Sequence, residues 1–410
     1  MSANEAAGEP AHGNAEARGS ALEVLLAFTK LGLTSFGGPV AHLGYFQAEL
    51  VDRRKWIDRE TYADLVALCQ FLPGPSSSQV GISLGIERAG LAGGLAAWLG
   101  FTLPSALALA LFALGVGTLE GADAWIHGLK VVAVPIVAIA VRDMARALCP
   151  DRRRATIAVL GALAALAWAS ALSQVAIIAG AGVLGWLLYR GEGAEAAVGA
   201  EVRAPLSPWI GVAAWIVFFA LLFGLPVLAS MTSLPGLDLF ERFYRVGALV
   251  FGGGHVVLPL LEHEVVAPGW TTSDRFLAGY GAAQAVPGPL FSLSAYLGFV
   301  LDTTPTRWAG AALALVAIFL PSFLLVVGAL PFWARLRRSA ISKSALKGTN
   351  AAVVGLLAAA LYDPVWKVAI ETRADFGLAL AAFLALSVWK APPWLVVALT
   401  AGASVALRSL

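Results

Sequence analysis

Long apolar stretches separated by short polar or charged segments run along the whole chain of 410 residues. Residues 91–117, 125–147 and 208–228 are each apolar for long enough to cross a lipid bilayer as a helix, which needs about 20 residues. Residues 155–189 are also apolar, with a polar midpoint at Ser170–Gln174, and fit two short spans or one bent hairpin. The pattern predicts an all-α polytopic membrane protein that is surrounded by the lipid bilayer.

The composition agrees with this prediction. Hydrophobic residues make up 59% of the chain and charged residues only 13%, whereas soluble domains contain about 25% charged residues. The formal net charge of +2 says little about partners, and no basic cluster with interleaved aromatic residues indicates a nucleic acid. Residues 1–20 are small, polar and acidic without an apolar core, so we expect a disordered tail rather than a signal peptide.

Two polar stretches that contain helix-breaking residues stand inside this apolar sequence. Gln70–Gln79 holds a Pro-Gly-Pro step at 73–75 followed by three serines, and Gln284–Ser292 holds the same step at 287–289. Each proline removes a backbone N–H and clashes with the preceding turn, so a continuous helix is disfavoured. The serines favour a new helix start near Ser76. Because broken backbone is tolerated in lipid only where it is buried or lines a wet cavity, the two stretches indicate a site.

From about residue 235 the second half of the chain repeats the first. Eight residues near the start of each half correspond to one another in order at a constant offset. In the first half they are Glu23, Phe28, Lys30, Gly32, Phe36, Gly37, Gly38 and Glu49, and in the second Asp238, Phe243, Arg245, Gly247, Phe251, Gly252, Gly253 and Glu264. With small changes in the offset, eight more residues correspond in order. In the first half they are Trp56, Gln70, Pro73, Gly74, Pro75, Ser78, Pro104 and Ser105, and in the second Trp270, Gln284, Pro287, Gly288, Pro289, Ser292, Pro321 and Ser322. This order predicts an internal duplication, with a first repeat at 21–190, a linker at 191–234 that includes one span at about 208–228, and a second repeat at 235–410.

The charges of the loops indicate that the two repeats have opposite orientations. Residues 52–59 and 142–154 are basic, whereas 118–127 carry acids and no Lys or Arg; in the second half, the counterpart of the acidic loop, 335–347, holds five basic residues and no acid. Short basic loops mark the cytoplasmic side of a membrane protein. The number of membrane crossings agrees with these loop positions if each half contains two broken or re-entrant elements that do not cross the membrane fully. Inverted repeats with broken helices are typical of secondary transporters.

Four break points, two in each half, would meet near the middle of the membrane in such a fold. Restarting helices present free N–H groups and the positive ends of their dipoles, glycines let a ligand approach the backbone, and nearby serines and glutamines add donors. This set suits a compact oxyanion, whose oxygens accept hydrogen bonds. Close helix packing is the alternative role for the glycines. The predicted substrate-binding residues are Lys30, Ser35, Gly37, Gly38, Gln70, Gly74, Ser76, Ser77, Ser78, Arg245, Gly252, Gly253, Gly254, His255, Gln284, Gly288 and Ser292.

The charged members of this set have alternative roles. Lys30 and Arg245 could pair with the anion or with an acid such as Glu23 or Asp238, or extend to the membrane surface. His255 suits either a proton relay or a hydrogen-bonded structural histidine. No metal site is predicted, because the two cysteines lie in apolar sequence without nearby histidines. No cofactor is expected either, since haem and Rossmann motifs are absent from the sequence, which argues against a redox enzyme.

Four short motifs stand out in the two halves: Phe36-Gly-Gly-Pro39, Leu72-Pro-Gly-Pro75, Phe251-Gly-Gly-Gly-His255 and Val286-Pro-Gly-Pro289. They resemble the motifs of the chromate ion transporter family in its long, two-domain form, and the resemblance extends over about residues 22–408. It implies a bacterial inner-membrane protein that exports chromate by means of the proton motive force and confers resistance. It also implies two antiparallel homologous halves, in agreement with the loop charges.

The sequence leaves alternatives to chromate export. Sulfate is a tetrahedral dianion like chromate, so backbone donors would discriminate poorly between them, and another oxyanion transporter is the nearest alternative. A passive anion channel is a second, because broken helices also occur in channels. The oligomeric state stays open, with a homodimer as one alternative.

Overall fold

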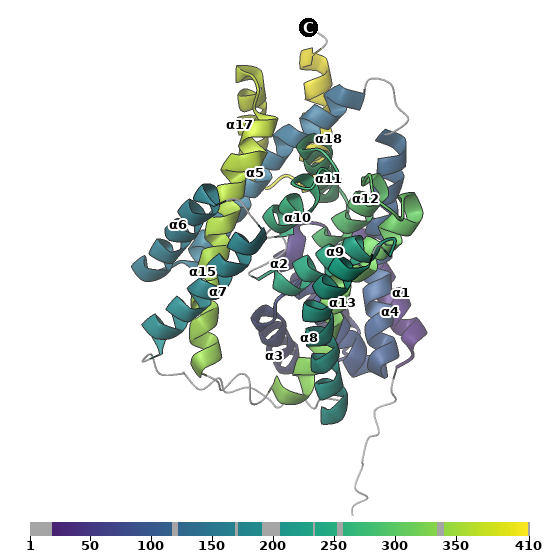
Figure 1. Ribbon diagram of the computed structural model, residues 1–410. Coiled ribbons are helices and arrows are strands. Elements are labelled where there is room, and N and C mark those ends of the chain that lie inside the picture. Colours follow the sequence, from purple (N-terminus) through teal and green to yellow (C-terminus); the bar gives the residue numbers. More distant parts are fainter. Residues whose placement is uncertain are drawn as a thin grey trace, which may run out of the picture.

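The computed structural model describes residues 19–116, 122–168, 171–190, 206–232, 234–251, 257–333 and 340–408, and these residues form helices and connecting turns without a strand (Figure 1). The prediction of an all-α polytopic membrane protein is confirmed. Residues 1–18, which include most of the predicted tail, lie outside the described residues.

One helix, α8 (Pro208–Met231), separates the helices of the first half from those of the second. Before it come α1 (Ala21–Thr34), α2 (Gly38–Phe46), η1 (Gln47–Arg53), α3 (Arg59–Phe71), α4 (Ser76–Val116), α5 (Ala122–Leu148), α6 (Arg152–Ala167) and α7 (Ala171–Tyr189). After it come α9 (Leu237–Leu249), α10 (Val257–Val266), α11 (Ser273–Ala285), η3 (Leu290–Ser292), α12 (Leu293–Val300), α13 (Arg307–Ala329), η4 (Leu330–Phe332), α15 (Ala340–Ala360), η5 (Leu361–Trp366), α16 (Lys367–Ala369), α17 (Arg373–Ser387) and α18 (Pro393–Arg408).

The Pro-Gly-Pro steps and a second break divide the middle of each half in the same way. The first step separates α3 from α4, and the second separates α11 from η3 and α12. Within α4 the backbone leaves the helical region at Ala89 and Gly90, and at the corresponding place the second half has a turn between α12 and α13. The predicted helix start at Ser76 is confirmed. The apolar stretch 155–189 contains two helices, α6 and α7, which pack together.

Among the residues that the structure describes, five helical segments are long and apolar enough to cross a membrane, namely 76–115, 124–148, 208–231, 307–332 and 343–369. Helix α8 has a largely exposed apolar surface that includes Trp209, Phe223 and Met231, as contact with lipid requires. Helix α2 contains 9 residues and continues into the 7 residues of η1, and α3 contains 13 residues. Both helical segments are too short to span about 30 Å of hydrocarbon. That they re-enter the membrane stays a prediction, as does the inverted orientation of the halves.

The two halves exchange helices at their periphery. Helix α5 of the first half packs against α17 and α18 of the second, whereas α15 of the second half packs against α6 and α7 of the first (Figure 1). Both contacts use glycine: a Cβ at Gly128 in α5 would collide with the backbone at Ala401, and a Cβ at Gly348 in α15 would collide with the carbonyl of Ala181. The halves are therefore interlocked rather than simply adjacent.

Candidate functional site

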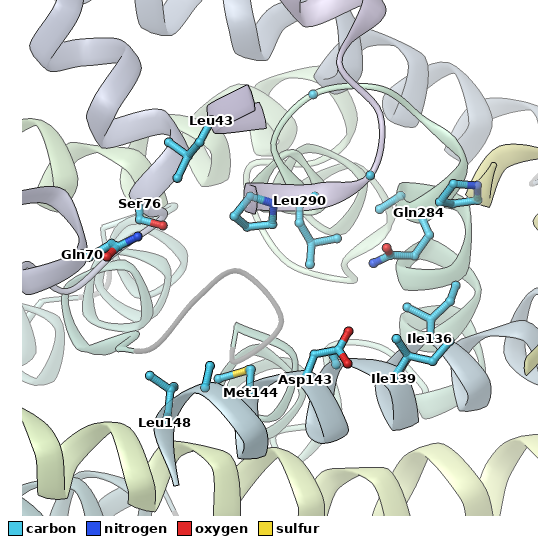
Figure 2. A pocket seen from close by; sticks show the side chains of 18 of the residues that line it. Leu43, Gln70, Ser76, Ile136, Ile139, Asp143, Met144, Leu148, Gln284 and Leu290 are labelled. Carbon is cyan, nitrogen blue, oxygen red and sulfur yellow. The ribbon is translucent and has the colours of Figure 1, made fainter. Parts of the chain in front are cut away.

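A cavity of about 960 Å³ lies between the two halves. Its walls are the Pro-Gly-Pro loop regions of both halves and one face of α5 from Ile136 to Leu148, with the segment that leads into α18 at its edge (Figure 2). Its volume is typical of a binding site for a small molecule.

The cavity gathers predicted site residues from both halves. Those that line it are Gly37, Gly38, Gln70, Gly74, Ser76, Gln284 and Gly288. Three of the four predicted break points thus contribute to one space. The fourth, with Gly252, Gly253, Gly254 and His255, lies outside the described residues.

The two Pro-Gly-Pro loops are joined to the opposite halves by reciprocal hydrogen bonds. The Gly74 N–H donates to the carbonyl oxygen of Val250 over 2.6 Å, and the Gly288 N–H donates to that of Ser35 over 2.9 Å. Ser35 follows α1 and Val250 follows α9, so the two bonds are equivalent in the repeat. These two amides bind protein, which leaves ligand binding to the groups beside them.

Each of these glycines also allows a close approach that another residue would prevent. Gly74 and Gly288 have φ values of 118° and 102°, in the region that favours glycine. A Cβ at Gly74 would collide with the hydroxyl of Ser322, and one at Gly288 would lie 2.9 Å from the hydroxyl of Ser105. Ser105 and Ser322 are themselves equivalent. We name each set of a Pro-Gly-Pro glycine, the carbonyl that it binds and the serine that it faces a joint between the halves, and this joint has been duplicated as a whole.

The serines after the first Pro-Gly-Pro step have different surroundings. Ser76 begins α4 and lines the cavity, and the first amides of a helix have no acceptor in a preceding turn. Ser77 is buried and its hydroxyl lies 3.2 Å from Nδ1 of His42. Ser78 is buried too, and in the second half Ser292 pairs with Ser105 over 2.6 Å. Of the predicted serines, Ser76 is therefore the one in the cavity wall, with the positive end of the α4 dipole.

Gln284 contributes a buried donor. Its Nε2 is buried and has no hydrogen-bond partner within the described part of the chain, and Figure 2 shows its amide directed into the cavity. A buried donor without a partner costs about 1–3 kcal/mol, so this group has reason to bind a ligand or water. The equivalent Gln70 also lines the cavity but is exposed.

Lys30 and Arg245 bind carboxylates of their own half and do not line the cavity. Lys30 Nζ lies 3.0 Å from Glu49 Oε2, and Arg245 Nη1 lies 2.8 Å from Glu264 Oε1. Glu49 and Glu264 are equivalent, so this ion pair is duplicated as well. It holds α1 against η1 in the first half and α9 against α10 in the second.

The sequence did not single out Asp143, Asn350 and Lys390, which line the cavity. Asp143 follows Arg142 in a segment that the charge pattern marked as a basic loop. A signal was nevertheless present, because Ile136, Ile139 or Ala140, Asp143 and Ala147 recur every three to four residues on one face of a helix.

The sequence reasoning also missed an ion-pair cluster near the N-terminus of α5, which we name the α5 seam. The buried His127 places Nε2 2.8 Å from Asp375 Oδ1, and the buried Lys130 places Nζ 2.7 Å from Asp274 Oδ1. Both bonds connect the first half to the second. The corresponding contact of α15, which we name the α15 seam, has Lys347 4.9 Å from the ring centre of Tyr189, whose hydroxyl donates to Asp151 over 3.0 Å.

Long apolar helices that enclose a cavity between two similar halves define a polytopic membrane protein of the transporter class. The family model described as "Chromate transporter" matches residues 22–186 and again 237–405. The chain belongs to this family. The two matches lie on either side of α8, so each half corresponds to one copy of the family unit.

Curated relatives cover most of the chain. A "Chromate transport protein" of Pseudomonas aeruginosa is 31% identical over 352 residues, which are 83% of this chain and 80% of that protein. A "Probable chromate transport protein" of Synechococcus elongatus is 30% identical over 82% of both chains. The "Uncharacterized transporter YwrB" of Bacillus subtilis is 33% identical over 41% of this chain and 85% of its own length, which is the size of a single unit. No solved structure matches the chain.

Proposed function

We propose that this protein is a secondary active transporter that exports chromate across the bacterial cytoplasmic membrane and so confers resistance to chromate. The observation that carries the proposal is the cavity between the halves, which both Pro-Gly-Pro loops line with hydrogen-bond donors. Membership of the chromate transporter family and relatives named for chromate transport support the choice of substrate.

The donors suit a tetrahedral oxyanion. Ser76 and the free amides at the start of α4 meet the ligand from the first half, and the Gln284 amide meets it from the second. Lys390 adds a positive charge at the edge of the cavity. Hydrogen bonds to an ionised oxygen are stronger than those between neutral groups, so a few fixed donors suffice.

The joints between the halves support alternating access. Because each Pro-Gly-Pro loop is bonded to the first helix of the opposite half, rocking of one half against the other would move both loops together. Inverted halves would then open the same cavity first to one side and then to the other. The proton motive force is the proposed energy source for this cycle.

Chromate uptake into inside-out membrane vesicles tests the proposal. We expect uptake when a proton gradient, acid inside, is imposed, and loss of uptake when a protonophore removes it. Vesicles that contain the Gly288→Leu variant serve as the control. Equal uptake with and without the gradient would indicate a passive channel, and absence of chromate uptake beside uptake of sulfate would indicate a sulfate transporter.

A further inference from the structure

Asp143 is an acidic side chain on the wall of the cavity to which Ser76 and Gln284 contribute hydrogen-bond donors. It lies on α5, opposite the Pro-Gly-Pro loops, and Figure 2 shows its carboxylate directed into the cavity. In the described part of the cavity wall, the charged side chains are Asp143 and Lys390. Asp143 Oδ1 accepts a hydrogen bond from Arg142 Nε over 2.9 Å, and no bond in the described part of the chain engages Oδ2.

A carboxylate in this position distinguishes oxyanions by whether they carry a proton. An ionised carboxylate only accepts hydrogen bonds, and so does a fully ionised tetrahedral dianion, so the two repel each other. An oxyanion that keeps one proton can donate its O–H to the carboxylate, in a short and strong bond. Hydrogen chromate keeps its proton up to nearly neutral pH, whereas hydrogensulfate is a strong acid and has lost its proton.

We propose that Asp143 is a specificity-determining residue that accepts a hydrogen bond from a singly protonated oxyanion and rejects sulfate. This inference rests on the proposed function and adds the form of the substrate. The Gln284 amide and Ser76, on the other walls, bind oxygens without a proton, and Asp143 binds the oxygen that carries one. The ion pair with Arg142 does not account for the position of Asp143, because an exposed pair of neighbouring side chains contributes little to stability.

Binding in this form takes up a proton. The occupied cavity holds one proton shared between Asp143 and the bound oxyanion, so binding of chromate from its dianion takes one proton from the cytoplasm. That proton leaves with the oxyanion, so export driven by the proton motive force requires more than one proton to enter the cell in the rest of the cycle. Chromate affinity should therefore fall as the pH is raised above neutral. When Asp143 is replaced by asparagine, the amide donates to an ionised oxygen, and this pH dependence should be lost together with the rejection of sulfate.

Equilibrium binding of labelled chromate to the purified full-length protein, with sulfate as competitor, tests this role below and above neutral pH. The variants are Asp143→Asn, Asp143→Glu, which keeps the carboxylate, and Asp363→Asn as matched control. Asp363 is also half exposed and paired with a basic neighbour, Lys367 at 2.7 Å, but it does not line the cavity. Thermal unfolding of each variant verifies that it is folded.

We expect sulfate to compete about 10- to 100-fold better in Asp143→Asn than in the wild type, the size of one hydrogen bond to a charged group. Asp143→Glu and Asp363→Asn should retain the wild-type preference and pH dependence. Equal competition by sulfate in the wild type and in Asp143→Asn would overturn the role of Asp143 while leaving oxyanion transport in place. A wild-type protein that binds phosphate, which also carries a proton, but not chromate would overturn the proposed substrate alone. Failure to bind any of these oxyanions would overturn both.

Discussion

The two Pro-Gly-Pro loops share their backbone and differ in their polar side chains. Gly74 and Gly288 make the same hydrogen bond to the opposite half, and each faces the equivalent serine, Ser322 or Ser105. After the first loop, Ser76 begins the helix α4 directly, whereas the second loop leads into Leu290 and a three-residue 3-10 turn. Duplication has thus preserved the joint, and the groups that meet the ligand have diverged.

The largest effect is expected from breaking the joint itself. Leucine at Gly74 or Gly288 requires a left-handed backbone, at a cost of about 1–2 kcal/mol, and places a side chain where the opposite serine lies. We expect both variants to insert into the membrane and to lose chromate transport and resistance. The measurement is growth in chromate together with the amount of protein in the membrane.

Gly269 provides the matched control for this pair. It also has a positive φ, of 78°, but a Cβ there meets no atom within 4 Å. Gly269→Ala should therefore show backbone strain without collision and keep most of the activity. If it inactivated the transporter as fully as Gly288→Leu, conformational strain alone would explain the result and the joint would lose its role.

The second comparison concerns the two seams, where α5 and α15 cross to the opposite half. His127 is 2% exposed and bonded to Asp375, so replacement by leucine removes one hydrogen bond from a buried carboxylate that keeps its bonds from Thr372, at a cost of about 1–3 kcal/mol. Lys347 is half-buried and lies over the ring of Tyr189, a contact worth about 0.5–2 kcal/mol. Thermal unfolding of His127→Leu and Lys347→Met in detergent should show the larger loss for His127. Equal losses would mean that the two seams contribute equally to stability despite their different contacts.

The repeated features of the fold could be predicted from the sequence, and the features that are not repeated were the ones missed. Prolines and glycines at fixed offsets mark the breaks, because backbone geometry at those positions tolerates few other residues. The equivalence of Lys30 with Arg245 and of Glu49 with Glu264 was visible in the same way, although their pairing emerged only from the structure.

Asp143 and His127 could not be found by that route. Each lies on α5 and works with residues more than 100 positions away: Asp143 lines the same cavity as Gln284, and His127 bonds to Asp375 at the seam. Such contacts depend on how the halves are interlocked, and a local pattern does not contain that information. Binding by Ser77 and Ser78 stays a prediction. Both follow Ser76 in sequence, but both are buried and neither is in the described cavity wall, because a helix turns successive residues to different sides.

A smaller effect separates the two equivalent glutamines. The Gln284 amide is buried in the cavity wall without a protein partner, whereas Gln70 is exposed. Gln284→Leu should therefore weaken chromate binding by about 10- to 100-fold, the loss of one hydrogen bond to a charged group, and Gln70→Leu by less. Binding of labelled chromate to both purified variants measures the difference. A greater loss for Gln70 would move the ligand toward the first half.

The smallest effect concerns the acid dependence of the ion pair between Lys30 and Glu49. Burial of the Glu49 carboxylate opposes ionisation, but hydrogen bonds from Arg53, Arg54 and Lys30 outweigh it and lower the pKa of Glu49 from 4.5 to about 2. A carboxyl group whose pKa is lower in the folded state stabilises the protein above its unfolded pKa, and this contribution is lost as the pH falls toward the folded pKa. We therefore expect the wild type to lose about 1–3 kcal/mol of stability from this group between pH 4.5 and about 2, and Glu49→Gln to lack that part of the acid dependence.

Thermal unfolding in detergent across this range provides the measurement, with Asp52→Asn, an exposed carboxylate paired with Arg59, as the control that should follow the wild type. An unchanged acid dependence in Glu49→Gln would show that the basic cluster around Glu49 holds α1 to η1 without needing its charge.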